Sequence, residues 1–361
     1  MKTLCVSKNG DFKVKNLNEI NIIRALACIF IVATHAITNY LRNIDVNLDT
    51  ENQYIVWIRF ALLCSTPIFI LISETLISRN YPEGVPKGFF LKRVKFILVP
   101  YILIGLVVSY RSSDGDLMSF LQVAVDKVLL GSWYGFFVIV IFQFYILHWL
   151  IGKYLARINP IGPLILSFLI TFFHVYGYVN VQAYQDFILT KYPFWYKTHI
   201  FMWIFYFIAA FYIGQYYEKI ITFLMEKIWI PVAATILTFG IIMYNYYEVG
   251  YTRVSSERYD MMLYSVSIFF LLVVFIRKFN FYHKGLMMVS HFSFYIYLTH
   301  LIILPYFTKL SLMFGENFFT YVIIMTFLTI STSIGGAMLY YQHKVTRLFT
   351  GKIQYLEEKR S

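Results

Sequence analysis

Apolar runs of about 18 to 25 residues recur along the whole chain, and short segments rich in charge, Gly or Pro separate them. Each run is long enough for one helix to cross a bilayer, because a helix rises about 1.5 Å per residue and the hydrocarbon core is about 30 Å thick. The pattern predicts an all-α integral membrane protein, a bundle of about ten transmembrane helices over 20–41, 53–78, 94–111, 131–151, 160–178, 199–217, 229–247, 261–277, 287–307 and 318–341.

Two stretches outside these runs refine the prediction. The segment 112–131 is short and amphipathic, which indicates an interfacial or re-entrant helix before the fourth crossing. The first 19 residues are polar and basic, and the run after them has no small-residue cleavage site, so we expect the first helix to stay in the membrane. The chain therefore divides into a basic tail (1–19), a transmembrane domain (20–341) and a C-terminal tail (342–361).

Composition supports this class. The chain has 361 residues, 59% of them apolar and 14% charged, which is too little polar surface for a soluble globule. Ten crossings place both termini on one side, together with about two thirds of the Lys and Arg, so the positive-inside rule predicts that both termini are cytoplasmic in a multi-pass protein of the cell membrane. The net charge of +12 then describes a surface facing anionic lipid and not a nucleic-acid binder. Cys5, Cys28 and Cys64 have neither disulfide nor metal-ligand spacing, so we expect no metal and no prosthetic group.

Two ionisable residues on the first predicted helix stand out. Inserting an Arg at the centre of a membrane-spanning helix costs roughly 2.5 to 3.5 kcal/mol of free energy on insertion scales. Arg24 and His35 are eleven residues apart, which places them on one helix face about 16 Å apart along the axis. A guanidinium near the inner end can bind an anion, and a deeper imidazole can act as a general base. The structural alternatives are that Arg24 snorkels to the headgroups and that His35 makes an interhelical hydrogen bond.

The second predicted helix carries Arg59 and Glu74 near one face. An antiparallel neighbour would bring Glu74 level with Arg24 and Arg59 level with His35. An Arg24–Glu74 ion pair is therefore a structural alternative to a ligand role for either residue.

Five motifs in register across some 300 residues then carry a family resemblance, in which Arg24 and His35 form the first signature. The motifs are PIFILISETLI (67–77), FFLKRVKFILVPYIL (89–103), GSWYGFFVIVIFQFYIL (131–147), WIFYFIAAFYIGQYYEK (203–219) and VSHFSFYIYLTH (289–300). Together they resemble the acyltransferase 3 family of membrane enzymes, which O-acylate glycans with acyl-coenzyme A. Within it, the chain is similar to the subgroup that includes the intercellular-adhesion C protein of biofilm polysaccharide operons.

The resemblance implies roles for particular residues. On this resemblance we expect His35 and Arg24 to be catalytic. As a hypothesis from charge and position, we expect Arg24, Lys92, Arg93 and Lys95 to bind acyl-CoA and Arg59, Glu74, Trp133 and His300 to bind the substrate. The chain departs from the family pattern at Ser73-Glu74-Thr75, where Ser-Gly-Phe is usual, and in its lysines on the third helix, which keep the charge but lose the guanidinium fork.

The function that the resemblance implies is transfer of an acyl group, acetyl or succinyl, from cytoplasmic acyl-CoA to a hydroxyl of a cell-surface or lipid-linked glycan. Acyl-CoA is a co-substrate here, and the expected partners are membrane lipid, the glycan acceptor and a polysaccharide synthase. Two other classes stay open. One is an exporter or flippase of an extracellular polysaccharide such as poly-N-acetylglucosamine. The other is a structural subunit of a synthase, for which no buried charge would be essential.

Overall fold

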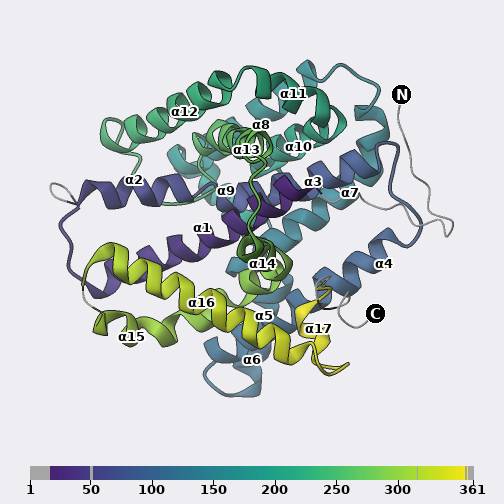
Figure 1. The fold of residues 1–361 in the computed structure, drawn as a ribbon. Coiled ribbons are helices and arrows are strands. Elements are labelled where there is room, and N and C mark those ends of the chain that lie inside the picture. Colours follow the sequence, from purple (N-terminus) through teal and green to yellow (C-terminus); the bar gives the residue numbers. More distant parts are fainter. Residues whose placement is uncertain (1–16, 49–51, 315, 354–355, 357–361) are drawn as a thin grey trace.

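The computed structural model describes residues 17–48, 52–314, 316–353 and 356, and within them every regular element is a helix (Figure 1). The main helices are α1 (Asn18–Asn43), α2 (Gln53–Leu62), α3 (Ser65–Asn80), α4 (Phe89–Arg93), α5 (Val99–Ser112), α6 (Leu117–Ala124), α7 (Phe137–Leu155), α8 (Ile161–Asn180), α9 (Gln182–Lys191), α10 (Ile204–Gln215), α11 (Tyr217–Glu226), α12 (Trp229–Tyr247), α13 (Met261–Lys278), α14 (Lys284–Ile303), α15 (Thr308–Met313), α16 (Phe318–Tyr340) and α17 (Arg347–Thr350).

The structure confirms an all-α membrane bundle. Among the described residues, eight helical segments are long and apolar enough to cross a membrane: α1, α2 with α3, α6 with α7, α8, α12, α13, α14 with α15, and α16. The two remaining predicted crossings are the shorter helices α5 and α10. The basic tail predicted over 1–19, with Cys5, lies almost entirely outside the described residues, whereas Cys28 and Cys64 are buried free thiols.

Two predicted spans need correction. The span 53–78 is broken at Leu63 and Cys64, because Pro67 has no N–H to donate to the carbonyl of residue 63. The break also leaves the carbonyl of Ala61 free to accept, and Tyr264 of α13 donates to it at 3.1 Å. The span 199–217 contains only the 12-residue α10, preceded by 3₁₀ turns; α10 is about 18 Å long and cannot cross the bilayer alone.

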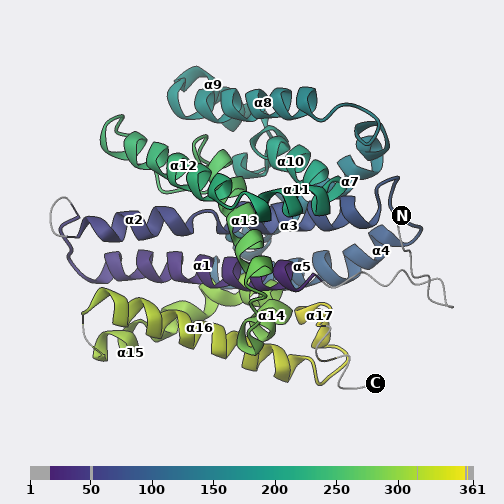
Figure 2. The same cartoon turned by 45° about the horizontal axis from the view of Figure 1, so that its top comes forward.

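The helix α1 occupies the middle of the bundle, where it packs against α14, α16, α3, α13 and α2. Figure 2 shows that α1 begins and α16 ends at the same end of the bundle, where α4 also lies. We call this the basal end, and the end where α1 leads to α2 the opposite end. The arrangement agrees with the predicted even number of crossings.

Small residues let α10 approach α3 closely. A Cβ on Gly214 would lie 2.5 Å from the carbonyl oxygen of Thr75, and Ser78 donates to the carbonyl of Phe211 at 2.7 Å. Since α10 is almost wholly buried, it serves as a packing element for α3, the helix that carries Glu74.

The predicted amphipathic segment 112–131 forms α6 and the π-helical turn Val125–Leu129. Its side chains Leu117, Met118, Leu121, Val125 and Leu129 are exposed apolar groups of the kind that face lipid. Residues 130–136 then interrupt the path to α7 with a turn at Gly131 (φ +82°) and a 3₁₀ turn. This interruption places Trp133 and Tyr134 beside α14.

Candidate functional site

The predicted face of α1 is present in the structure. Arg24 and His35 are both half-buried, and Cys28 and Ile31 lie between them on the same face, both buried. The thiol of Cys28 points at the carbonyl of Ser293 on α14, at 3.8 Å. The face therefore has a polar group near each end and apolar packing in between.

A second histidine lies beside His35. The ring centroids of His35 and His300, which α14 carries, are 5.1 Å apart. Nδ1 of His300 lies 2.6 Å from the carbonyl oxygen of Tyr297, which can only accept, so we assign the proton to Nδ1. Nε2 of His300 is then a buried lone pair, and neither it nor the His35 ring has a hydrogen bond within the described part of the chain. Two imidazoles with free nitrogens are suited to proton transfer.

The interrupted segment before α7 packs against this histidine pair. The Tyr134 ring lies 5.3 Å from that of His300, and its hydroxyl donates to the carbonyl of Leu298 at 2.9 Å. Tyr297 donates in return to the carbonyl of Tyr134, at 2.6 Å. The predicted sugar-binding Trp133 is 4% exposed, and Gly135 lies so close that an added Cβ would be only 2.4 Å from the indole ring. Trp133 therefore packs behind Tyr134 and presents no open face.

Cations surround His35 on the side of the opposite end. Arg59 donates to Thr38 Oγ1 at 3.1 Å and leaves its Nε without a partner in the described structure. Lys197 pairs with Glu257 at 3.1 Å. Both cations interact electrostatically with His35, as predicted for Arg59, whereas no sequence motif selects Lys197.

The basal end holds the predicted anion-binding cations. Arg93 of α4 lies over the ring of Tyr145, its Cζ 5.5 Å from the centroid, and Arg24 interacts electrostatically with both residues. Lys92 and Lys95 are exposed nearby on the same turn of chain. In the described structure neither guanidinium forms an ion pair with an acid; Arg24 donates only to Asn21 Oδ1, at 3.3 Å. We call Arg24, Arg93 and Tyr145 the basal cation site.

Glu74 lies elsewhere than predicted. Its carboxylate is fully buried and bonds through Oε1 to Nδ1 of His148 on α7, at 2.6 Å, while Nε2 of His148 lies 3.0 Å from the carbonyl of Tyr81. The alternative of an Arg24–Glu74 ion pair is therefore wrong. Glu74 also has no open surface at which to meet a substrate, because α10 and α7 cover it.

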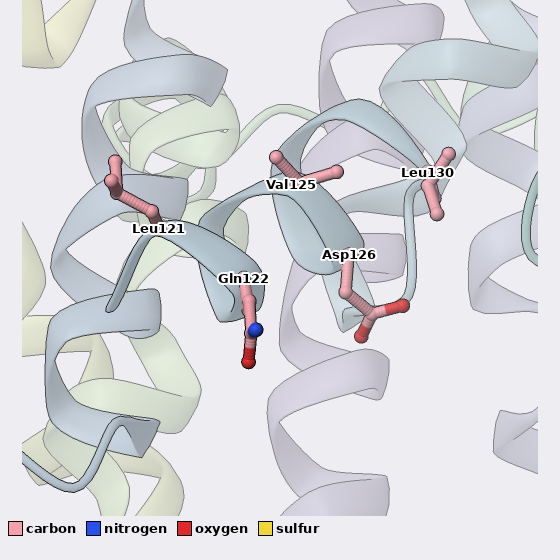
Figure 3. Close-up of a pocket in the computed structure, with 5 residues that line it drawn as sticks. All are labelled: Leu121, Gln122, Val125, Asp126 and Leu130. Atoms are coloured by element: carbon pink, nitrogen blue, oxygen red, sulfur yellow. The ribbon is translucent and has the colours of Figure 1, made fainter. Parts of the chain in front are cut away.

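A groove of about 360 Å³ lies on the outer surface of the segment α6 to residue 130 (Figure 3). It is lined by Leu121, Gln122, Val125, Asp126 and Leu130, and the Asp126 carboxylate accepts a hydrogen bond from Ser132. None of the predicted site residues lines it.

The family model described as an acyltransferase domain, that of acyltransferase 3, matches residues 17–340. The chain belongs to the acyltransferase 3 family. The matched region contains the two histidines, the basal cation site and the interrupted segment. No solved structure matches the chain.

Named relatives fall into two groups. The chain is 32% identical to a "Probable poly-beta-1,6-N-acetyl-D-glucosamine export protein" of Staphylococcus aureus, over 93% of this chain and 96% of the relative, and 32% identical to the protein of that name in Staphylococcus epidermidis, over 94% and 96%. It is 34% identical to the "Putative membrane-bound acyltransferase YfiQ" of Bacillus subtilis, over 79% and 80%. The predicted likeness to the polysaccharide subgroup is confirmed. With the helices, these comparisons identify a multi-pass membrane protein of an acyltransferase family.

Four residues of the site were missed from the sequence: Tyr134, Tyr145, His148 and Lys197. Three of them lie in or next to the fourth-helix motif. Tyr145 and His148 are three residues apart, so the spacing could have identified one face of that helix as part of the candidate site. Lys197 lies in a connecting segment with no periodic signal. Its position depends on contacts with distant parts of the chain, such as its ion pair with Glu257 at 3.1 Å.

Proposed function

We propose that this protein transfers an acyl group, acetyl or succinyl, from cytoplasmic acyl-CoA to a hydroxyl of a cell-surface or lipid-linked glycan at the cell membrane. One observation carries the proposal. The guanidinium of Arg24 lies near the basal end of one face of α1, close to Arg93 of α4, and neither has an acidic partner in the described structure. About 16 Å away on the same face of α1 lies the imidazole of His35, beside that of His300. An anionic donor and a proton-transfer step need these two features in that order.

The donor would bind at the basal end, which we place at the cytoplasm. Coenzyme A carries phosphates, and Arg24 and Arg93 are two electrostatically interacting cations whose charges nothing acidic in the described structure neutralises. Lys92 and Lys95, both exposed, would add attraction at the entrance. The role needs no metal or prosthetic group.

The chemistry would take place at the histidine pair. His35 removes the proton of the acceptor hydroxyl while that oxygen attacks the thioester carbonyl. The tetrahedral intermediate collapses, the C–S bond breaks, and the imidazolium returns the proton to the departing thiolate. The free Nε2 of His300 would accept a hydrogen bond from His35 or from the acceptor, and Arg59 would stabilise the developing oxyanion.

The pantetheine arm has to pass Cys28 and Ile31 between the two ends. Both side chains are apolar, so the arm would be shielded from water once they move apart, which suits transfer of an acyl group that hydrolysis would otherwise destroy. The glycan would arrive from the opposite end, free, on lipid or from a polysaccharide synthase.

Export is the second candidate, because relatives of 32% identity are named as export proteins. The test is mass analysis of surface glycans from cells with the gene, without it, and with the His35→Ala protein. Transfer predicts an alkali-labile mass increment that only the wild-type gene restores. Unchanged esters together with glycan retained inside cells would overturn the proposal in favour of export.

A further inference from the structure

An ion pair between two connecting segments lies near the histidine pair, at the opposite end of the bundle. Lys197 belongs to the segment between α9 and α10 and Glu257 to that between α12 and α13, and their charged atoms are 3.1 Å apart. Lys197 interacts electrostatically with His35. Glu257 does so with Tyr297, whose carbonyl oxygen lies 2.6 Å from Nδ1 of His300. The pair therefore lies on the side from which the acceptor would reach the two imidazoles.

Both side chains of the pair are held in place. Ser255 donates to the carboxylate of Glu257, which is 3% exposed. The ammonium of Lys197 lies over the rings of Trp195 and Phe136, 5.1 and 5.8 Å from their centroids. Because these contacts already order the lysine, a ligand that binds it loses less conformational entropy.

The ammonium of Lys197 has donors left for a ligand. It carries three N–H groups, and Glu257 is its only acceptor in the part of the chain that the structure describes. The Lys197 side chain is 21% exposed, so it is the accessible member of the pair. Two N–H groups are thus available to a ligand near His35.

The charges of the pair favour a neutral ligand. They cancel, unlike those of the basal cation site, and an anionic group bound to Lys197 would also meet the carboxylate of Glu257. A sugar hydroxyl or an amide oxygen accepts from the ammonium without that repulsion. We infer that Lys197, oriented by Glu257, binds a neutral sugar ring of the acceptor glycan and positions its hydroxyl at His35. The inference rests on the proposed function, since it names the acceptor site of that reaction.

The test measures transfer kinetics of the purified full-length protein with acetyl-CoA and succinyl-CoA as donors. The acceptor probe is the total glycan, free and lipid-linked, extracted from cells that lack the gene. Lys197→Met keeps the side-chain length but removes the donors, and should raise KM for the glycan about tenfold to a hundredfold. Lys197→Arg keeps the charge and the N–H donors and should stay within about fivefold of wild type. The Kd of 3′,5′-ADP, the phosphorylated part of coenzyme A, should be the wild-type value in both variants, because the donor site is not touched.

Two further variants sharpen the measurement. Arg253→Gln is the matched control: in the described structure this cation of the same end donates to the hydroxyl of Tyr196 at 2.9 Å and does not interact with His35. It should leave KM for the glycan unchanged. Lys197→Met combined with Glu257→Gln leaves no unpaired buried carboxylate, so it replaces the single variant if that one does not fold, and the same rise in KM is expected.

Melting temperatures are measured in parallel. A pair that only joins two segments predicts that Lys197→Met melts at a lower temperature while the folded protein keeps the wild-type KM for the glycan, and that result would overturn the inference. An equal rise in KM with Arg253→Gln, or a weaker affinity for 3′,5′-ADP in Lys197→Met, would overturn it too. If the wild-type protein acylates no component of the glycan, the proposed function itself fails, which is a different result from any of these.

Discussion

The two pairs of arginines at the basal end differ in one respect: acidic residues neutralise one pair and not the other. Arg79 and Arg277 approach Glu218 at 2.8 and 2.7 Å, Arg277 also reaches Glu19 at 3.0 Å, and both guanidiniums lie over the ring of Tyr217. This cluster joins α3, α11, α13 and α1. Two cations meet two carboxylates there, so the cluster is electrically balanced and serves as a clamp.

Arg24 and Arg93 lie at the same end of the bundle, but their positive charges are not neutralised by carboxylates of the described structure. They also gather around a tyrosine, Tyr145, but no acid of the described structure pairs with them, and the carboxylate of Glu74 is bonded to His148. Two like charges brought together without a counter-ion raise the free energy of the empty protein. A ligand can supply the missing charge, and for this reason we propose the basal cation site, and not the clamp, as the binding site of the comparison.

The largest expected effect lies at the other end of the same helix face. His35→Ala should reduce acyl transfer at least about a hundredfold, the low end of what general-base catalysis contributes, while 3′,5′-ADP still binds with wild-type Kd at the cation site. Transferase assays with purified protein and acyl-CoA check this. Wild-type turnover in this variant would remove the histidine from the mechanism.

The comparison itself is tested by matched substitutions of the arginines. Arg24→Gln should raise the KM for acyl-CoA by about tenfold to a hundredfold, because a charge-assisted contact with phosphate is lost. Arg79→Gln removes a guanidinium of the clamp at the same end and should leave that KM unchanged. Equal shifts in both variants would show that general charge at the basal end, and not the lack of a partner, controls donor binding.

A smaller effect is expected from Arg59, whose Nε has no partner among the described residues. If the acyl group carries a carboxylate, Arg59→Gln should lower kcat/KM for succinyl-CoA about tenfold more than for acetyl-CoA, because only succinyl presents an anion near His35. Side-by-side kinetics with the two donors measure the ratio. An equal loss with both donors would leave Arg59 with the proposed oxyanion role alone and rule out a part in selectivity.

The smallest effect concerns the clamp. Arg277, which donates to Glu218, holds the pKa of that carboxyl below its ordinary value of 4.5. The contact therefore stabilises the fold above about pH 4.5, and this contribution is lost as the pH falls below that value. Melting temperatures of wild type and Glu218→Gln should converge on acidification, whereas a difference that persists unchanged at low pH would contradict the assignment.

Much of the fold could be predicted because the bilayer imposes a length and an apolarity that a sequence displays directly. The positions of α1, α8, α12, α13 and α16 follow from those two quantities. The break at Leu63 and Cys64 and the shortness of α10 did not, because both depend on partners from other helices: Tyr264 at the freed carbonyl of Ala61, and α3 against Gly214.

The candidate site divides in the same way. The sequence by itself determined that Arg24 and His35 share one face of α1, since the helical repeat fixes the angle between two residues of one helix. Only the tertiary structure decided that Arg93 joins Arg24 and that His300 joins His35, and it gave Glu74 to His148, 74 residues along the chain. The physical reason is that pairing between helices depends on their rotation, depth and packing, and no local pattern encodes these.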